Sequence, residues 1–286
     1  MKIVILGGTG LIGEALKQNF KLNHEVQCIG REAFISFETL LSAVQNSDLV
    51  IQLSGANISR RWSSAYMKEI WSSRVDATNL LASVIHSLPN KPKIICASAV
   101  GFYPESDCER PLNETDNFPG SDFLAELSVA WEEAAKSISS DAIIFRFGVV
   151  LSRNGGALKQ MYWPYLLGFG GPIKGGKHCF SWVHMKDLIK AFEFILNQTD
   201  ANGIYNLTSP QPIQQKYFGK VLAKTLKRPF LFPLFEWQLK LLFGKGSRVL
   251  TQSVSVTPKF LLDEGFVFDF PDIESALLDL IKRDKT

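Results

Sequence analysis

The sequence predicts an α/β fold built on a doubly wound parallel sheet. Short apolar runs alternate with helix-length amphipathic segments through about residue 205, as in a parallel sheet with helices on both faces. The runs are rich in Ile, Val, Leu, Cys and Phe, which is typical of strands buried on both sides. Directly after the first run comes a glycine-rich turn, Gly7-Gly8-Thr9-Gly10-Leu11-Ile12-Gly13.

The apolar runs and amphipathic segments place the individual elements. We expect strands at residues 2–6, 25–29, 48–53, 93–98, 142–147 and 203–207. We expect helices at residues 11–21, 63–88, 121–138 and 185–197. Ser121 or Asp122 can cap the third of these helices. Residues 168–177 contain too many glycines for a regular element, so they form a loop that either borders a ligand or only connects two elements.

Length and pattern predict one large domain and one small one. The chain has 286 residues, which is ample for a sizeable core. Beyond about Pro210 the alternation stops, and aromatic and proline residues crowd positions 229–237. We therefore divide the chain into a nucleotide-binding domain at 1–210 and a smaller C-terminal region at 211–286 on the substrate side.

Composition indicates an ordinary globular protein. Hydrophobic residues make up 46% and charged residues 21%, and the formal net charge is only +3 without a long basic run, so nothing favours nucleic acid as a partner. No apolar stretch approaches the roughly 18 residues of a membrane span. The N-terminal strand is too short for a signal peptide. We expect a cytoplasmic protein without a membrane partner, although a mature chain that has lost a transit peptide is an alternative.

Cysteine and histidine spacing predicts no metal site. The four cysteines lie far apart without a CxxC pair, and two of them fall inside apolar runs; they are Cys28, Cys96, Cys108 and Cys179. We expect all four to be reduced packing residues. The four histidines are equally scattered, so no pair at helical spacing is available to hold a metal.

The glycine turn predicts a dinucleotide site on a Rossmann-type domain. Gly7, Gly10 and Gly13 lie between a strand and a helix, where backbone amides and the positive end of the helix can hold a pyrophosphate. Glycine allows the tight turn and the close approach of backbone to phosphate. We expect this loop, with Thr9, Leu11 and Ile12, to contact the cofactor. The alternative is a glycine-rich turn without a ligand.

The ends of the second and third strands favour NADP as the cofactor. NAD-binding proteins usually place an acid after the second strand to accept the ribose hydroxyls. Here Arg31 occupies that place, and a guanidinium can pair with a 2′-phosphate. Glu32 takes the ribose role instead if the strand ends one residue later, and Arg31 is then a solvated surface residue. After the third strand, the small residues of Leu53-Ser54-Gly55 allow the chain to approach the adenosine closely.

Several motifs together resemble a known family. They are GGTGLIG at 7–13, LSGANI at 53–58, SRVDATNLL at 73–81, SAVGFYP at 98–104, RFGVVLSRNGGAL at 146–158 and FSWVHMKDL at 180–188. Across nearly the whole chain they are similar to the atypical short-chain dehydrogenases/reductases called epimerase family proteins. The stretch from Thr257 to Phe266 resembles the small domain that ends these proteins. The resemblance implies NADP(H) binding and a relation to nucleotide-sugar epimerases and dehydratases, but it does not establish catalysis.

The sequence departs from the wider superfamily at its proton relay. Typical members carry a tyrosine and, four residues later on the same helix, a lysine that lowers the pKa of the phenol from about 10. At these places the chain has Phe123 and Leu127. The usual relay is therefore missing.

Four other side chains are candidates for the site, each with an ordinary structural alternative. Ser98 can hydrogen-bond a substrate oxygen or cap its strand end, although its spacing to Tyr103 is one residue longer than in the epimerase pattern. Tyr103 is the substitute acid or base we expect near the carboxyl end of the sheet, or it packs on its loop. Arg146 contacts the cofactor or the substrate, or it holds a loop carbonyl. Arg74 faces the active site or forms a surface ion pair.

Two further residues, Lys177 and His178, lie in or beside the glycine-rich loop. They approach a substrate if that loop borders the ligand.

Two function hypotheses follow. The first is an NADP(H)-dependent oxidoreductase or epimerase-like enzyme that acts on a small molecule near Ser98 and Tyr103. The second is a dinucleotide-sensing or interaction protein that keeps the binding fold without the chemistry, as Phe123 and Leu127 suggest. A Rossmann protein using a flavin or an adenosylated methyl donor is a third alternative. The sequence leaves open the substrate and whether the chain is a monomer or a dimer.

Overall fold

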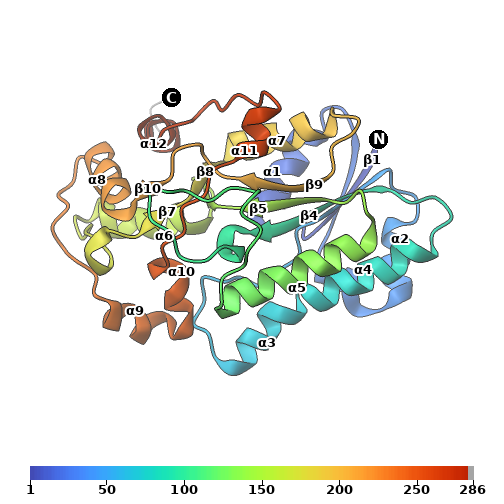
Figure 1. Cartoon of the computed structure of the whole chain (residues 1–286), viewed down its shortest axis with the longest axis horizontal. Helices are drawn as coiled ribbons and strands as arrows, with labels where there is room; N and C mark the ends of the chain where they lie inside the picture. The colour runs from blue at the N-terminus through green and yellow to red at the C-terminus, as the bar shows by residue number, and fades with distance from the viewer. Residues whose placement is uncertain (283–286) are drawn as a thin grey trace.

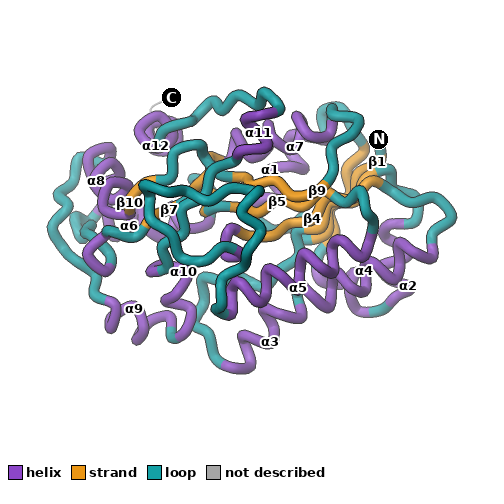
Figure 2. Tube along the Cα trace, viewed as in Figure 1, coloured by secondary structure: helices purple, strands orange, loops and turns teal. Residues whose placement is uncertain are grey.

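A computed structural model describes residues 1–282 and confirms the α/β fold. Six parallel strands form a central sheet in the order β2-β1-β3-β4-β5-β9, with helices on both faces (Figures 1 and 2). The strands are β1 (Lys2–Leu6), β2 (Glu25–Ile29), β3 (Leu49–Gln52), β4 (Lys93–Ala99), β5 (Ile143–Phe147) and β9 (Gly203–Leu207). All six match the expected strands to within one residue at either end.

The order of the strands creates a crevice at the carboxyl end of β1. The chain runs from β1 outward to β2 and then crosses back to β3 on the other side of β1. Leu6, the last residue of β1, therefore lies between Ile29 of β2 and Gln52 of β3. Doubly wound sheets bind ligands outside the carboxyl ends of the strands, where the strand order reverses.

Alternate residues of the strands bury two separate cores. On one face, α1 (Leu11–Phe20) and α7 (Met185–Leu196) pack against strand residues such as Ile5 and Phe145. On the other face, α2 (Phe37–Val44), α4 (Val75–Ser87) and α5 (Phe123–Ile138) pack against residues such as Val4 and Ile144. This period of two is what a strand covered on both faces requires.

The single helix expected at 63–88 is instead two helices, α3 (Ser64–Ser72) and α4. At the break, the side chains of Ser73 and Arg74 form hydrogen bonds with the backbone of α3 and of the loop after β3. Ser73 Oγ donates to the Ile70 carbonyl and accepts from the Ala56 amide, at 3.1 and 2.9 Å. Arg74 donates to the carbonyls of Ile70 and Ala56, at 3.2 and 3.0 Å. These bonds satisfy the end of α3 and tie it to the loop after β3, which the hydrophobic period alone did not predict.

Most of the remaining elements lie at the opposite end of the sheet from α2 (Figure 1), whereas α11 packs beside β9. Two short two-stranded sheets, β6 with β8 and β7 with β10, lie outside the central sheet. Their bounds are β6 (Val149–Leu151), β7 (Cys179–Phe180), β8 (Trp182–His184) and β10 (Ile213–Gln214). The helices are α6 (Gly156–Leu166), α8 (Gln215–Thr225), α9 (Glu236–Phe243), α10 (Arg248–Thr251), α11 (Lys259–Asp263) and α12 (Ile273–Lys282).

The C-terminal region shares a core with the first domain. Leu158 of α6 and Trp182 of β8 pack in one hydrophobic cluster with Phe218 and Leu222 of α8 and Leu277 of α12. Residues on both sides of position 210 contribute to this cluster, so the division at 210 stays a prediction. The glycine-rich segment 168–177 is a loop except for one short turn, η3 (Lys174–Gly176).

The cysteine prediction is right for two residues and wrong for two. Cys96 is fully buried, which raises the pKa of its thiol to about 12, and Cys28 is a half-buried free thiol. Cys108 and Cys179 instead form a disulfide. The spacing of 71 residues gave no sign of the pairing, because the loop after β4 folds across the chain to reach β7. Such a bond is uncommon in the cytoplasm.

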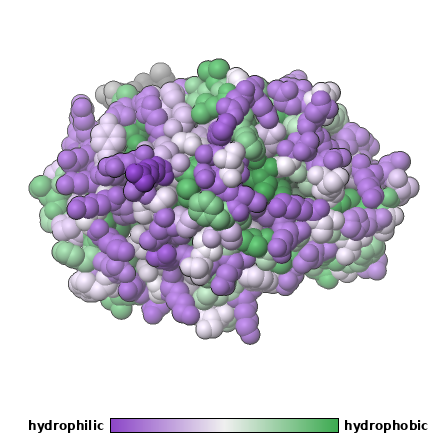
Figure 3. All heavy atoms as spheres, in the orientation of Figure 1, coloured by the Kyte–Doolittle hydropathy of each residue, from purple (hydrophilic) through white to green (hydrophobic). Residues whose placement is uncertain are grey.

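Within residues 1–282, no group of His, Cys, Asp and Glu side chains is arranged to hold a metal ion. In the same range no helix is long and apolar enough to cross a membrane. Hydrophilic side chains cover much of the face shown in Figure 3, with apolar patches between them.

The disulfide predicts a stability difference that depends on reductant. We expect Cys108→Ser to lower the free energy of unfolding by about 2–4 kcal/mol in oxidising buffer, because a long loop is no longer closed. The loss should vanish when both proteins are unfolded in urea with dithiothreitol. Cys28→Ser is the matched control and should respond equally in both buffers. Equal stability of wild type with and without reductant would contradict the bond.

Candidate functional site

The loop between β1 and α1 has a backbone that no larger residue can follow. Gly7 has a positive φ of 81°, and a Cβ there would lie 2.8 Å from the Leu53 carbonyl carbon. A Cβ on Gly13 would lie 2.6 Å from the Gly8 Cα. The amides of Gly7 and Gly8 both donate to the Ile29 carbonyl, at 2.8 and 3.2 Å. The glycines therefore clamp the loop between β2 and β3.

The first turn of α1 is open at its N-terminus. Gly10 is the N-cap and supplies no side-chain hydrogen bond. The first amides of a helix lack partners within the helix, and they carry the positive end of its dipole. A diphosphate placed against Leu11, Ile12 and Gly13 would satisfy these amides.

The end of β2 separates the two candidates for the adenosine side. The Glu32 carboxylate turns back and accepts the Gly30 amide at 2.7 Å. Hydrogen bonds from the backbone of Glu32 itself and of Gly30 lower the pKa of this carboxyl. Arg31 points outward with its side chain 77% exposed, and its Nη1 lies 3.3 Å from Glu69 Oε1. Arg31 is thus the group free to turn toward a ligand.

The end of β3 holds an unsatisfied hydroxyl beside the glycine loop. Ser54 is buried, and its Oγ has no hydrogen-bond partner among the described residues. Ser54 N lies 2.9 Å from the position of a Cβ on Gly7, so the two loops are in contact. Because a buried hydroxyl without a partner is costly, this group is suited to bind an incoming polar ligand.

Arg74 lies under the loop after β3 and is partly buried. A Cβ on Gly55 would lie 2.7 Å from the Arg74 Cζ, so glycine is needed for the guanidinium to pack there. Burial lowers the Arg74 pKa to about 10. Its guanidinium donates to two backbone carbonyls and lies 5.3 Å from the centre of the Trp131 ring. This position does not match the surface ion pair that was the alternative for Arg74, because its partners are carbonyls and an aromatic ring; the role of an active-site group stays a prediction.

Ser98 and Arg146 are joined by Glu132 in a buried network. Glu132 accepts from Arg146 Nε and Nη2, both at 2.7 Å, and from Ser98 Oγ at 2.7 Å. The three residues are at most 2% exposed. Burial alone would lower the Arg146 pKa, but the hydrogen bonds and charge of Glu132 raise it. The guanidinium also lies 3.5 Å from the centre of the Phe102 ring.

This network does not favour the roles that the sequence suggested for Ser98 and Arg146. The Ser98 hydroxyl is committed to a carboxylate on α5, and two nitrogens of Arg146 are committed to the same group. The network instead ties β4 and β5 to α5, the helix that begins at Phe123. Glu132 was not singled out from the sequence, since a carboxylate in mid-helix ordinarily faces solvent.

Tyr103 is likewise not an open acid or base. It is fully buried, and its hydroxyl lies 3.0 Å from Asn206 Oδ1 and 3.1 Å from the Asn113 carbonyl oxygen. Burial raises the pKa of this phenol. Val254 and Val256 of the C-terminal region cover it. The side chain fixes the loop after β4, which is the packing alternative stated for it above.

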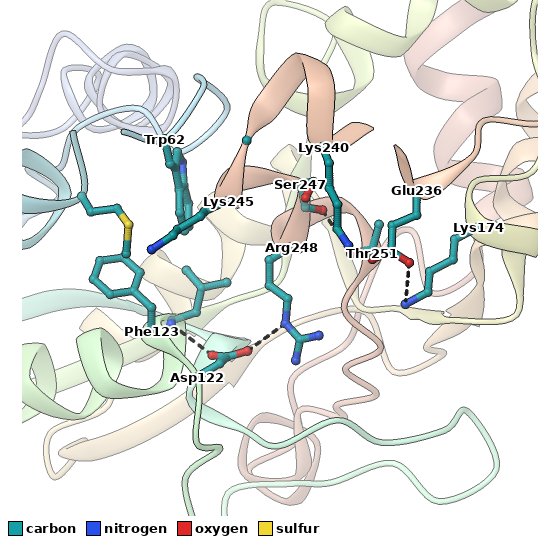
Figure 4. Close-up of a pocket in the computed structure, with 13 residues that line it drawn as sticks. Trp62, Asp122, Phe123, Lys174, Glu236, Lys240, Lys245, Ser247, Arg248 and Thr251 are labelled. Atoms are coloured by element: carbon teal, nitrogen blue, oxygen red, sulfur yellow. Dashed lines mark hydrogen bonds and ion pairs between the residues drawn. The ribbon is translucent and has the colours of Figure 1, made fainter. Parts of the chain in front are cut away.

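A cavity of about 510 Å³ opens beside Phe123, at the start of α5 (Figure 4). Its apolar wall comes from Trp62, Met67, Phe123 and Leu124, and the rest comes from Asp122 at the start of α5, from the glycine-rich loop and from the C-terminal region. These others are Asp122, Lys174, Glu236, Lys240, Gly244, Lys245, Ser247, Arg248 and Thr251. The volume falls in the range of small-molecule sites.

The cavity was only partly predictable. The Trp62 ring lies on its wall, 5.6 Å from the ring of Phe123. Lys174 represents the glycine-rich loop, whereas Lys177 and His178 are not among the residues that line the cavity. The basic residues of segment 240–248 carried no sequence motif, so nothing indicated them before the fold brought them to α5.

Family models match most of the chain. The model described as NAD dependent epimerase/dehydratase family matches residues 3–208. The model described as a domain of unknown function (DUF1731) matches residues 234–280, which include much of the basic side of the cavity.

Two curated relatives are named epimerase family proteins. The chain is 33% identical over 297 residues to Epimerase family protein SA0724 of Staphylococcus aureus (strain N315), covering 98% of this chain and 99% of that protein. It is 33% identical over 294 residues to Epimerase family protein SSP1921 of Staphylococcus saprophyticus, covering 97% and 98%.

Solved structures agree with this relationship. The human epimerase family protein SDR39U1 (isoform 2), solved with NADPH, matches with a TM-score of 0.89 and 30% identity over 99% of both chains. A dTDP-4-dehydrorhamnose reductase from Bacillus anthracis, solved with NADP, matches with a TM-score of 0.80 over 99% of both chains. Its identity is 13%, so this second likeness shows the fold alone.

The buried network predicts a large cost for removing one partner. We expect Glu132→Gln to lower the free energy of unfolding by about 3–5 kcal/mol, because the Arg146 charge is left buried without its counter-ion. Ser98→Ala should cost only about 1 kcal/mol, the value of one hydrogen bond. Urea unfolding followed by circular dichroism measures both.

The double variant Glu132→Leu with Arg146→Met is the control. It removes both charges, so it should recover most of the stability lost in Glu132→Gln. A Glu132→Gln protein as stable as wild type would contradict the network.

Proposed function

Because the chain belongs to the NAD-dependent epimerase/dehydratase family, we propose that it binds NADP(H) at the β1–α1 loop and transfers hydride to or from a small molecule in the cavity beside Phe123. The observation that carries this proposal is the glycine clamp at Gly7 and Gly13 in front of an uncapped α1. The epimerase family protein solved with NADPH has the same fold over 99% of both chains.

The residues at the ends of β1 and β3 fit a dinucleotide. The open amides of Leu11, Ile12 and Gly13 would hold the diphosphate, and Thr9 and Gly10 would line its path. The buried hydroxyl of Ser54, which has no partner among the described residues, would gain one from the adenosine half. Leu53 and Gly55 would border the same half through their backbone.

The end of β2 favours the phosphorylated dinucleotide. In NAD-binding sites a carboxylate at this place accepts the ribose hydroxyls. Here the Glu32 carboxylate is already engaged by the Gly30 amide. Arg31 has only an exposed partner, Glu69, and exposed ion pairs are weak enough to exchange. A 2′-phosphate would offer Arg31 a charge-assisted pair instead.

The substrate place follows from the path of the chain between the two sites. The loop after β3 runs from Ser54, beside the proposed adenosine place, to Trp62 on the cavity wall. Trp62 packs against Phe123, the residue at the place of the superfamily's tyrosine. A nicotinamide reaching from the glycine loop toward α5 would therefore face the cavity.

The source of the proton differs from that in typical short-chain dehydrogenases. When bound, NADP(H) supplies or accepts the hydride. Phe123 and Leu127 offer no proton, so the proton at the reacting oxygen comes from another cavity group or from water. Ser98, Tyr103 and Arg146 keep the walls in place: the first and last fix α5 through Glu132, and Tyr103 fixes the loop after β4.

A second candidate function is a dinucleotide sensor without turnover. The substitution of the tyrosine–lysine relay by Phe123 and Leu127 favours it. Incubation with NADPH and a panel of aldehydes and ketones, followed by absorbance of the reduced nicotinamide and by product analysis, separates the two. Consumption of NADPH with formation of an alcohol supports the enzyme. Tight NADPH binding without turnover of any compound, and without a co-purifying substrate-like ligand in mass spectrometry, supports the sensor.

The cofactor assignment predicts a selective loss in one variant. We expect Arg31→Ala to weaken NADPH binding by about tenfold to a hundredfold, because one charge-assisted contact is worth roughly 1.5–3 kcal/mol. NADH binding should change by less than about twofold, since NADH lacks the 2′-phosphate. Titration of nicotinamide fluorescence measures both. Arg110→Ala, on an exposed loop residue, is the control, and equal losses for NADPH and NADH would overturn the assignment.

A further inference from the structure

The cavity beside Phe123 has an excess of positive charge. Four of its lining residues are basic and two are acidic: Lys174, Lys240, Lys245 and Arg248 against Asp122 and Glu236. Arg61 adds to the excess at the rim, because a Cβ on the lining residue Gly244 would lie 3.5 Å from the Arg61 Cγ. The whole chain has a formal charge of only +3, so this concentration is local.

Both acidic residues of the cavity are already engaged. Glu236 pairs with Lys240 at 2.9 Å and with Lys174 at 3.5 Å. Hydrogen bonding from Lys240 and the charge of Lys174 lower the pKa of this carboxyl. Asp122 caps α5 through its Oδ1, which accepts the amides of Leu124 and Ala125 at 3.0 and 3.1 Å. Its Oδ2 accepts from Arg248 at 3.1 Å. Neither carboxylate is left for Lys245.

Lys245 forms no ion pair with any residue in the described part of the chain, 1–282. It is exposed, and its side chain extends toward Phe123 and Trp62 in Figure 4. Its neighbours hold it there. The Trp62 amide donates to the Phe243 carbonyl at 3.1 Å, and a Cβ on Gly246 would lie 2.9 Å from the Trp62 ring. These contacts hold the backbone on both sides of Lys245, so its side chain starts at the edge of the apolar wall.

We propose that this cavity selects a small molecule that carries a carboxylate or a phosphate on an apolar body, with Lys245 as the residue that binds the anionic group. The inference deepens the proposed function, on which it rests, by naming the substrate class of the same cavity. Trp62 and Phe123, whose rings meet edge to face, bind the apolar body. The anionic group supplies the counter-charge that this side of the cavity lacks.

The cavity offers an anion with an apolar body a charged group beside an apolar wall. An anion near Lys245 gains attraction from an ammonium that no carboxylate of the cavity neutralises, because Glu236 pairs with Lys174 and Lys240 while Arg248 pairs with Asp122 and Glu105. An apolar wall on one side lowers the screening by water. A neutral analogue of the same shape gains only the apolar contact. Selectivity for the anion should therefore exceed what a single exposed ion pair gives, and it should weaken as salt is added.

Matched benzene probes test the proposal on the whole protein saturated with NADP⁺. Benzoate, phenyl phosphate and neutral benzamide are titrated separately by calorimetry. We expect at least one anion to bind about tenfold more tightly than benzamide. Binding of benzoate alone identifies carboxylates as the class, and binding of phenyl phosphate alone identifies phosphate esters. Benzamide binding as tightly as both anions would overturn the proposal.

Variants of Lys245 locate the effect. Lys245→Gln should weaken the preferred anion by about fivefold and leave benzamide unchanged, whereas Lys245→Arg should retain anion binding. Lys220→Gln, an exposed lysine on α8 outside the cavity, is the matched control. Anion binding that survives Lys245→Gln would contradict the assignment. A separate titration with NADPH distinguishes a failure of the proposed function from a failure of this inference. Absence of NADPH binding would contradict the proposed function. NADPH binding without a preference for anions would contradict only this inference.

Discussion

The bare backbone of residues 7–13 is the constraint on which the rest of the site depends. At Gly7 and Gly13 a Cβ would lie within 3 Å of neighbouring backbone atoms, so only glycine lets the loop pass between β2 and β3. That passage brings α1 close to the sheet with its first amides facing the crevice. The same passage places Ser54 beside the loop. The proposed cofactor site is therefore a consequence of how tightly three strands and one helix pack.

A second constraint engages polar residues at the ends of β4 and β5 in a buried network. The pair between Glu132 and Arg146 is 2% exposed or less, and it takes the Ser98 hydroxyl into the same network. Breaking such a pair is costly, so these groups are held for structure. The hydrogen bonds of Glu132 to Ser98 and Arg146 anchor α5 to β4 and β5. This anchoring keeps Phe123 at the mouth of the cavity. Polar groups that face the cavity then come mainly from the C-terminal region.

The sequence predicted the elements that depend on interactions between residues close together in the chain. Strand ends were right to within one residue because buried parallel strands are continuous apolar runs, and the glycine loop was recognisable from its order between strand and helix. What failed depended on contacts distant in the chain. The break at Ser73 and Arg74 serves carbonyls of another loop, and the disulfide joins residues 71 positions apart. Ser98, Tyr103 and Arg146 look like site residues at strand ends, and only the fold shows that Glu132 and Asn206 hold their polar groups. Val254 and Val256 of the C-terminal region also pack on Tyr103.

The central claim is that the glycine loop and the cavity beside Phe123 form one site. A crystal structure of the protein soaked with NADP⁺ tests it most directly. The account predicts the diphosphate against the N-terminus of α1, the 2′-phosphate at Arg31 and the nicotinamide facing the cavity within reach of Phe123 and Lys245. A dinucleotide whose nicotinamide lies on another side of the sheet, with the cavity untouched, would contradict it.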